Sequence, residues 1–247
     1  MFYLPRCDIW RVPMTAFGLS RMLHTSADMP LVPLGRQTRL GELAYTSLKA
    51  AIVRGEFAPG QKLTLRAVAQ ALGVSTTPAR DAITRLIGEG ALVNIGPKTI
   101  VLPPLTHAVL EEVTAIRLSL EGMAAVLATA RIGAEEIDNL KRIQNHINAA
   151  LDEQKYVSAL KYNKEFHFLI YGSTAMPRLV AMIESLWLRI GPALNDLYPA
   201  FATSRIGVSN HMAAIAGLEG RDPLRVKAAI EKDIRDGYER LAQRIQD

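Results

Sequence analysis

The sequence is poor in features that would place it outside the cell, in a membrane or in a common enzyme class. Cys7 is its only cysteine, which excludes an internal disulfide and favours a reducing cytoplasm. No uncharged apolar run approaches the ~20 residues of a membrane span, and no signal-peptide apolar region is present. The HExxH, G-x-S-x-G, P-loop and Rossmann motifs are also absent, which counts against the enzyme classes that they define.

Positive charge is concentrated in the first part of the chain. Residues 38–103 hold 8 basic and 4 acidic side chains, whereas residues 104–247 hold 17 and 18. A local basic excess indicates a polyanionic partner for that region. Residues 1–37, with 4 basic and 2 acidic side chains, are expected to be a disordered extension or to precede a true start at Met29.

The remainder divides at the PPLT segment, residues 103–106, into domains 38–104 and 105–247. After the linker, apolar residues recur at helical spacing and no β-alternating run follows. Helices are expected over about 109–131, 133–152, 154–172, 176–198, 203–219 and 222–245. The predicted fold is therefore mainly α, with an all-helical bundle as the second domain.

The first domain has the pattern of a winged helix-turn-helix. Helices are expected over about 40–54, 65–72 and 76–89, and the runs ALVNI and TIVLP flank the IGPK turn as a small β-hairpin wing. Gly73 can end the second helix in a left-handed conformation, and Ser75 can cap the third. Thr76, Thr77 and Arg80 then open the exposed face of a helix suited to the major groove of DNA. The alternative is an ordinary amphipathic helix of a helical enzyme.

These residues resemble the GntR family of bacterial transcription regulators, through GEFAPGQKL, LGVSTTPARDAITRL and EGAL. The resemblance implies a DNA-binding head, with Lys98 as a wing contact or, equally, a solvated loop lysine. Thr76 replaces the family's usual arginine and Leu65 its usual glutamate. The first departure removes a base or phosphate contact, so the operator is expected to differ from the common family half-site. The expected DNA-binding residues are Arg66, Ser75, Thr76, Thr77, Arg80 and Lys98.

In the second domain, NKEFH places Asn163 and His167 four residues apart, hence on one face of a helix. That spacing suits two ligands of one metal ion, although asparagine is a weak ligand. A working site, a damaged site and two unrelated polar residues are all compatible with the pair alone.

The helical remainder, about residues 106–245, resembles the FCD ligand-binding domain of FadR-type GntR regulators. The resemblance aligns NKEFH with a D-x-x-F-H motif and implies the metal ligands Asn163, His167, His211 and Asp233. Two imidazoles and a carboxylate suit Zn²⁺, Ni²⁺ or Mn²⁺, and the carboxylate has moved from the first position to the fourth. The alternative is a metal-free polar cluster in which His167 pairs with Asp233.

The resemblance also implies a small effector, often a carboxylic acid, beside the metal. Arg117 is the expected partner of its carboxylate and Arg189 the second choice, while a salt bridge of Arg117 with Glu121 is the rival interpretation. The predicted function is a cytoplasmic, homodimeric regulator that binds a near-palindromic operator and controls a metabolic operon. The alternative is a metal-dependent enzyme that uses His167, His211 and Asp233.

Overall fold

The computed structural model describes residues 36–194 and 205–245. The expected extension therefore lies almost wholly outside the described residues. Its last residues are an exception, because helix α1 (Arg36–Val53) begins at Arg36 rather than near Leu40. No proline or glycine lies between Arg36 and Leu40, so no helix-breaking residue prevents the helix from beginning at Arg36.

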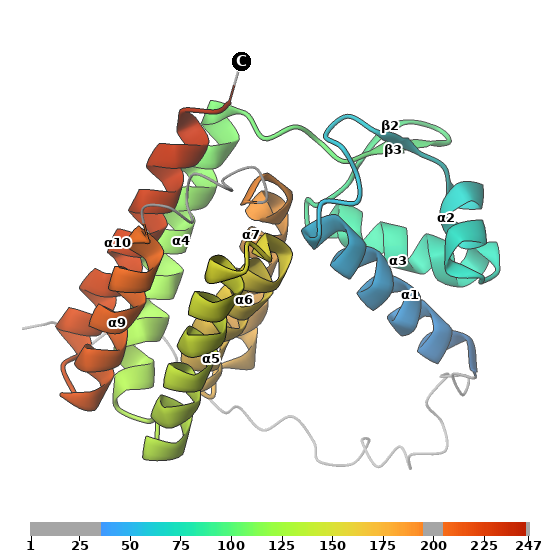
Figure 1. The fold of residues 1–247 in the computed structure, drawn as a ribbon. Coiled ribbons are helices and arrows are strands. Elements are labelled where there is room, and N and C mark those ends of the chain that lie inside the picture. The colour runs from blue at the N-terminus through green and yellow to red at the C-terminus, as the bar shows by residue number, and fades with distance from the viewer. Residues whose placement is uncertain (1–35, 195–204, 246–247) are drawn as a thin grey trace, which may run out of the picture. The chain divides into compact units, whose positions relative to one another are not determined.

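The first domain contains α1, α2 (Leu65–Leu72), α3 (Thr76–Gly88) and a small antiparallel sheet (Figure 1). The hairpin is formed by β2 (Val93–Gly96) and β3 (Thr99–Val101), as the sequence predicts. A third strand, β1 (Lys62–Leu63), was not predicted; it pairs with β3 and gives the order β1-β3-β2. Two residues carry no periodicity, so only long-range pairing reveals this strand.

The helix-turn-helix forms as its local signals predict. Gly73 ends α2 with φ 65°, in the left-handed region, and its N–H donates to carbonyls of the preceding turn. Ser75 occupies the N-cap position of α3 in an extended conformation. The buried side of α3 carries Ala79, Ala82 and Leu86, each 0% exposed, so the opposite side faces solvent.

The second domain is a bundle of helices coloured from green to red in Figure 1. Thr106, at the end of the predicted linker, caps the first of them by accepting from the Val109 N–H. The described helices are α4 (His107–Thr129), α5 (Ala134–Asp152), α6 (Tyr156–Gly172), α7 (Pro177–Leu194), α9 (Ile206–Glu219) and α10 (Pro223–Ala242). The predicted end of α7 and start of α9 lie outside the described residues.

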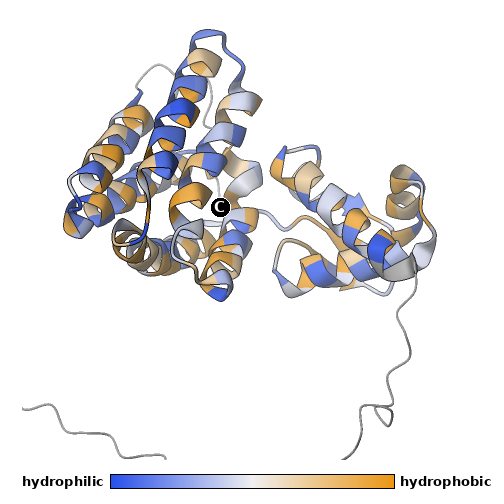
Figure 2. Cartoon of the chain, turned by 90° about the horizontal axis from the view of Figure 1, so that it is seen from below, coloured by the Kyte–Doolittle hydropathy of each residue, from blue (hydrophilic) through white to orange (hydrophobic). Residues whose placement is uncertain are grey.

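Packing within this bundle brings distant segments together. Helix α10 packs against α4 and α9, and α5 packs against α6 and α9. The apolar core includes Leu140, Phe166, Ile183, Leu218 and Ile230. Along each helix, hydrophilic and hydrophobic residues alternate in short bands, as expected of helices with one buried side (Figure 2). Within the described residues, no helix is long and apolar enough to cross a membrane.

Candidate nucleic-acid interface and metal centre

The predicted DNA-binding side chains are all solvent-exposed in the first domain. Ser75, Thr76, Thr77 and Arg80 lie at the N-terminal end of α3, and the Ser75 hydroxyl makes no capping hydrogen bond. Hydroxyls that are not used in capping remain able to donate to phosphate or to base edges. A helix N-terminus also attracts phosphate through its unpaired backbone N–H groups. This end of α3 therefore offers neutral donors and one cation to a polyanion.

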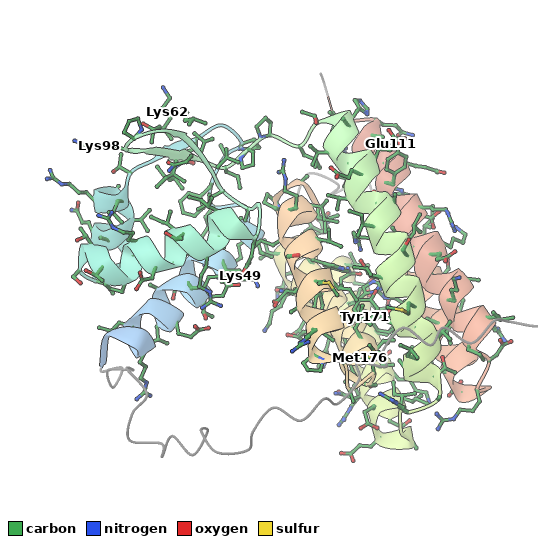
Figure 3. The ribbon with its side chains drawn as sticks, turned by 180° about the vertical axis from the view of Figure 1, so that it is seen from behind. Lys49, Lys62, Lys98, Glu111, Tyr171 and Met176 are labelled. Atoms are coloured by element: carbon green, nitrogen blue, oxygen red, sulfur yellow. The ribbon has the colours of Figure 1, made fainter. Side chains whose placement is uncertain are left out.

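Two further predicted contacts are also exposed basic side chains. Arg66 is exposed on α2, and Lys98 is exposed at the turn between β2 and β3. The structure adds Lys62, which is exposed on β1 and labelled beside Lys98 at the wing in Figure 3. Sequence reasoning missed Lys62 because the strand that brings it to the wing is too short to predict.

In the second domain, α6, α9 and α10 bring His167, His211 and Asp233 together. One potential ligand atom from each lies within 4.8 Å of the others. The His167 Nε2 atom is 3.3 Å from His211 Nε2 and 3.2 Å from Asp233 Oδ2. Both histidines are buried, with 0% and 2% exposure. Asn163, the fourth predicted ligand, lies one turn before His167 on α6.

The outer nitrogens of both rings are already in use. His211 Nδ1 lies 2.7 Å from Gln144 Oε1, and the Gln144 amide donates to Asn148. Gln144 therefore presents an acceptor, so His211 carries its proton on Nδ1 and leaves Nε2 with a free lone pair. The His167 Nδ1 atom lies 3.1 Å from the Tyr171 hydroxyl in the same way.

Electrostatics at this cluster favour a positive charge between the three ligand atoms. Burial lowers the pKa of His211 to about 3, with Asp233 opposing and His167 reinforcing the shift, so the ring is neutral at pH 7. Burial alone would raise the pKa of Asp233, but its hydrogen bond and charge interaction with His167 outweigh burial and lower it to about 2. Lone pairs that converge at this distance repel one another, and a metal ion bound among them would remove the repulsion. The donor set fits a divalent transition metal.

A small cavity of about 50 Å³ adjoins this cluster. Its walls include Arg117, Asn163, Trp187, Asp233 and Tyr238. At roughly 10–15 Å³ for each water-sized centre, the cavity has room for a few such groups. The cavity therefore has room for the polar end of a small molecule.

The two predicted effector arginines occupy different places. Arg117 lines the cavity, but its Nε atom lies 2.6 Å from Glu121 Oε1, so the rival salt bridge is present. Arg189 donates to the carbonyl oxygens of Pro103 and Pro104 and is absent from the cavity walls that the described residues form. Only Arg117 is thus brought next to the metal-ligand cluster.

Comparison with known proteins accounts for both regions. The family model described as bacterial regulatory proteins, gntR family, matches residues 40–98, and the FCD domain model matches residues 112–236. The chain belongs to the GntR family, with an N-terminal helix-turn-helix domain and a C-terminal FCD domain. It is therefore a DNA-binding transcription regulator and not an enzyme.

Individual relatives agree with this assignment. The chain is 32% identical over 177 residues to the HTH-type transcriptional regulator McbR of Escherichia coli, covering 71% of this chain and 80% of that protein. The solved structure of E. coli McbR/YncC superimposes with a TM-score of 0.77 at 28% identity, covering 83% of this chain and 98% of the other. The Nta operon transcriptional regulator of Aminobacter aminovorans is 32% identical over 137 residues, which cover 54% of this chain and 63% of that protein.

Proposed function

We propose that this protein is a cytoplasmic, homodimeric regulator of a metabolic operon that responds to a small carboxylate effector. Two winged-helix domains bind the two halves of a near-palindromic operator, since two-fold protein symmetry matches two-fold operator symmetry. The exposed N-terminal end of α3, with its free hydroxyls and Arg80, supports the DNA-binding part. Arg66, Lys62 and Lys98 add sequence-independent contacts to phosphates.

The convergence of His167, His211 and Asp233 beside a cavity is the observation that carries the sensing part. A divalent ion of the Zn²⁺, Ni²⁺ or Mn²⁺ class would be held by these three residues, with Asn163 as a weaker neutral fourth ligand. Such an ion would offer a ligand position to the effector carboxylate, and Arg117, which is paired with Glu121, would lie beside it in the cavity wall.

The dimer has two conformations, which differ in their affinity for the operator. An effector that binds one conformation more tightly than the other shifts the balance between them and so changes operator occupancy. A coupling of ~1–3 kcal/mol changes operator affinity by ~5–150-fold, which is enough for a switch. A thermal-shift screen of carboxylic acids, run on zinc-loaded and on chelated protein, tests the sensing part. Stabilisation that needs zinc supports it, and a ligand that stabilises the chelated protein equally well removes the metal from the proposal.

The DNA-binding part is tested with an operator selected from a randomised DNA library. We expect Arg80→Ala to weaken operator binding ~10-fold or more and to reduce the salt slope by about 1, as measured by fluorescence anisotropy. Arg85→Ala is the matched control, because Arg85 lies on the same helix but stacks on Tyr45 and pairs with Glu42. Equal affinities of the Arg80 variant and the unaltered protein would show that α3 is not the recognition helix.

The metal ligands are ranked by their chemistry. His167→Ala and Asp233→Ala should each lower Zn²⁺ affinity more than Asn163→Ala does, because a neutral amide oxygen is the weakest of these donors. Competition with a chromophoric chelator measures the three affinities. An Asn163 variant that loses as much affinity as the His167 variant would contradict this ranking.

A further inference from the structure

Tyr171 connects the metal-ligand cluster to a buried carboxylate. It lies on α6 one turn after His167, is 0% exposed, and is labelled within the helical bundle in Figure 3. Its hydroxyl oxygen is 2.5 Å from Glu121 Oε2 and 3.1 Å from His167 Nδ1. One hydroxyl therefore makes both hydrogen bonds.

The direction of these two hydrogen bonds follows from proton counting. Glu121 already accepts hydrogen bonds on both oxygens, from Arg117 and from the Trp187 indole N–H. It has no proton to give, so the single Tyr171 proton points to Glu121 and the Tyr171 oxygen accepts from His167 Nδ1–H.

The consequence lies at the other nitrogen of His167. A neutral imidazole has one N–H, and holding it at Nδ1 leaves the Nε2 lone pair directed at His211 and Asp233. Without the hydroxyl, the neutral ring gains more by carrying its proton on Nε2, where Asp233 Oδ2 accepts it at 3.2 Å. That proton would have to be displaced before a metal could bind.

We propose that Tyr171, oriented by Glu121, is a positioning residue that keeps the His167 Nε2 lone pair available to the metal ion. This inference rests on the metal centre of the proposed function. Gln144 holds His211 in the same tautomer from a different helix, so the two histidines have separate outer partners. Each partner can therefore be removed while the other serves as an internal reference.

Zinc affinity is the first test, measured by competition with a chromophoric chelator on the full-length protein. Tyr171→Phe keeps the ring and removes the hydroxyl, and we expect Zn²⁺ affinity to fall ~10–100-fold, as for other outer partners of metal-binding histidines. Tyr162→Phe is the matched control, because Tyr162 is a partly buried tyrosine of the same helix whose ring contacts His146. Its zinc affinity should equal that of the unaltered protein.

Long-range ¹H–¹⁵N spectra of the chelated protein provide a readout that a loss of packing alone would not produce. Tyr171→Phe should shift the ring nitrogens of His167 and leave those of His211 in place, whereas Gln144→Leu should do the reverse. Zinc affinity of Tyr171→Phe within twofold of the unaltered protein, or unshifted His167 nitrogens, would overturn this inference and leave the metal centre intact. Absence of zinc binding by the unaltered protein would overturn both, while the operator-binding test stands independently.

Discussion

Replacing Glu121 by leucine tests the energetics of the buried network most directly. Glu121 is 0% exposed and accepts hydrogen bonds from Arg117, Tyr171 and Trp187. Leucine keeps a similar volume but removes the charge, so the guanidinium of Arg117, 8% exposed, loses its ion-pair partner. Removing one partner of a buried ion pair costs ~3–5 kcal/mol. Each neutral donor left unpaired adds ~1–3 kcal/mol, unless it rotates to another acceptor.

We therefore expect Glu121→Leu to lower the free energy of unfolding by ~4 kcal/mol or more, and Tm by about 10 °C, for a chain of this size. Urea unfolding followed by Trp187 fluorescence measures the free energy of unfolding with a reporter that contacts Glu121 directly. Trp10→Phe in every variant leaves Trp187 as the single tryptophan, since the chain has only two.

The double variant Arg117→Met/Glu121→Leu separates charge from packing. It removes both charges, and apolar replacement of a buried ion pair is often neutral, so it should recover ~2 kcal/mol or more relative to Glu121→Leu. The single variant Arg117→Met completes the cycle. Additive losses in the double variant, or a loss below ~1 kcal/mol for Glu121→Leu, would refute the interpretation of this pair as a desolvated, mutually dependent unit.

Two further predictions concern stability in the metal-free protein. Burial lowers the pKa of His211 to about 3, from ~6.5 in the unfolded chain, so the unfolded chain binds a proton more readily as the pH falls. The contribution of neutral His211 to the free energy of unfolding is therefore complete above pH ~6.5 and decreases as the pH falls toward about 3. Urea unfolding should show a free energy of unfolding ~2 kcal/mol lower at pH ~5 than at neutral pH, and His211→Gln should flatten this dependence. An equal slope in that variant would assign the effect to another group. Gly217→Ala should destabilise by ~1–3 kcal/mol, because its Cβ would lie 2.8 Å from Val226 Cγ2 and 3.0 Å from the Val226 backbone nitrogen. Gly237 lies inside α10, and a Cβ added there would meet nothing within 4 Å, so Gly237→Ala should instead stabilise the protein by ~0.5–1 kcal/mol. Equal stabilities of the two variants would show that Gly217 is not required by the close approach of the α9 and α10 backbones.

The local features of this protein follow from short stretches of its sequence. Gly73, Ser75 and Pro78 define the turn and the start of α3 by interactions within a few residues, and helical spacing predicts which face of each helix is buried. The same spacing put Asn163 and His167 on one face. The resemblance to the GntR and FCD families, which the comparisons confirm, extended these local patterns to two whole domains.

Tertiary structure alone decided which distant groups meet. Periodicity identifies a buried face but not the residue that packs against it, so the contact of Gln144 with His211, 67 residues away, has no signal in one sequence. Glu121 was expected only as a possible partner of Arg117, yet it also accepts from Tyr171 and Trp187, which lie 50 and 66 residues further on. These long-range hydrogen bonds orient the site, because a buried polar group must find a partner wherever the fold brings one.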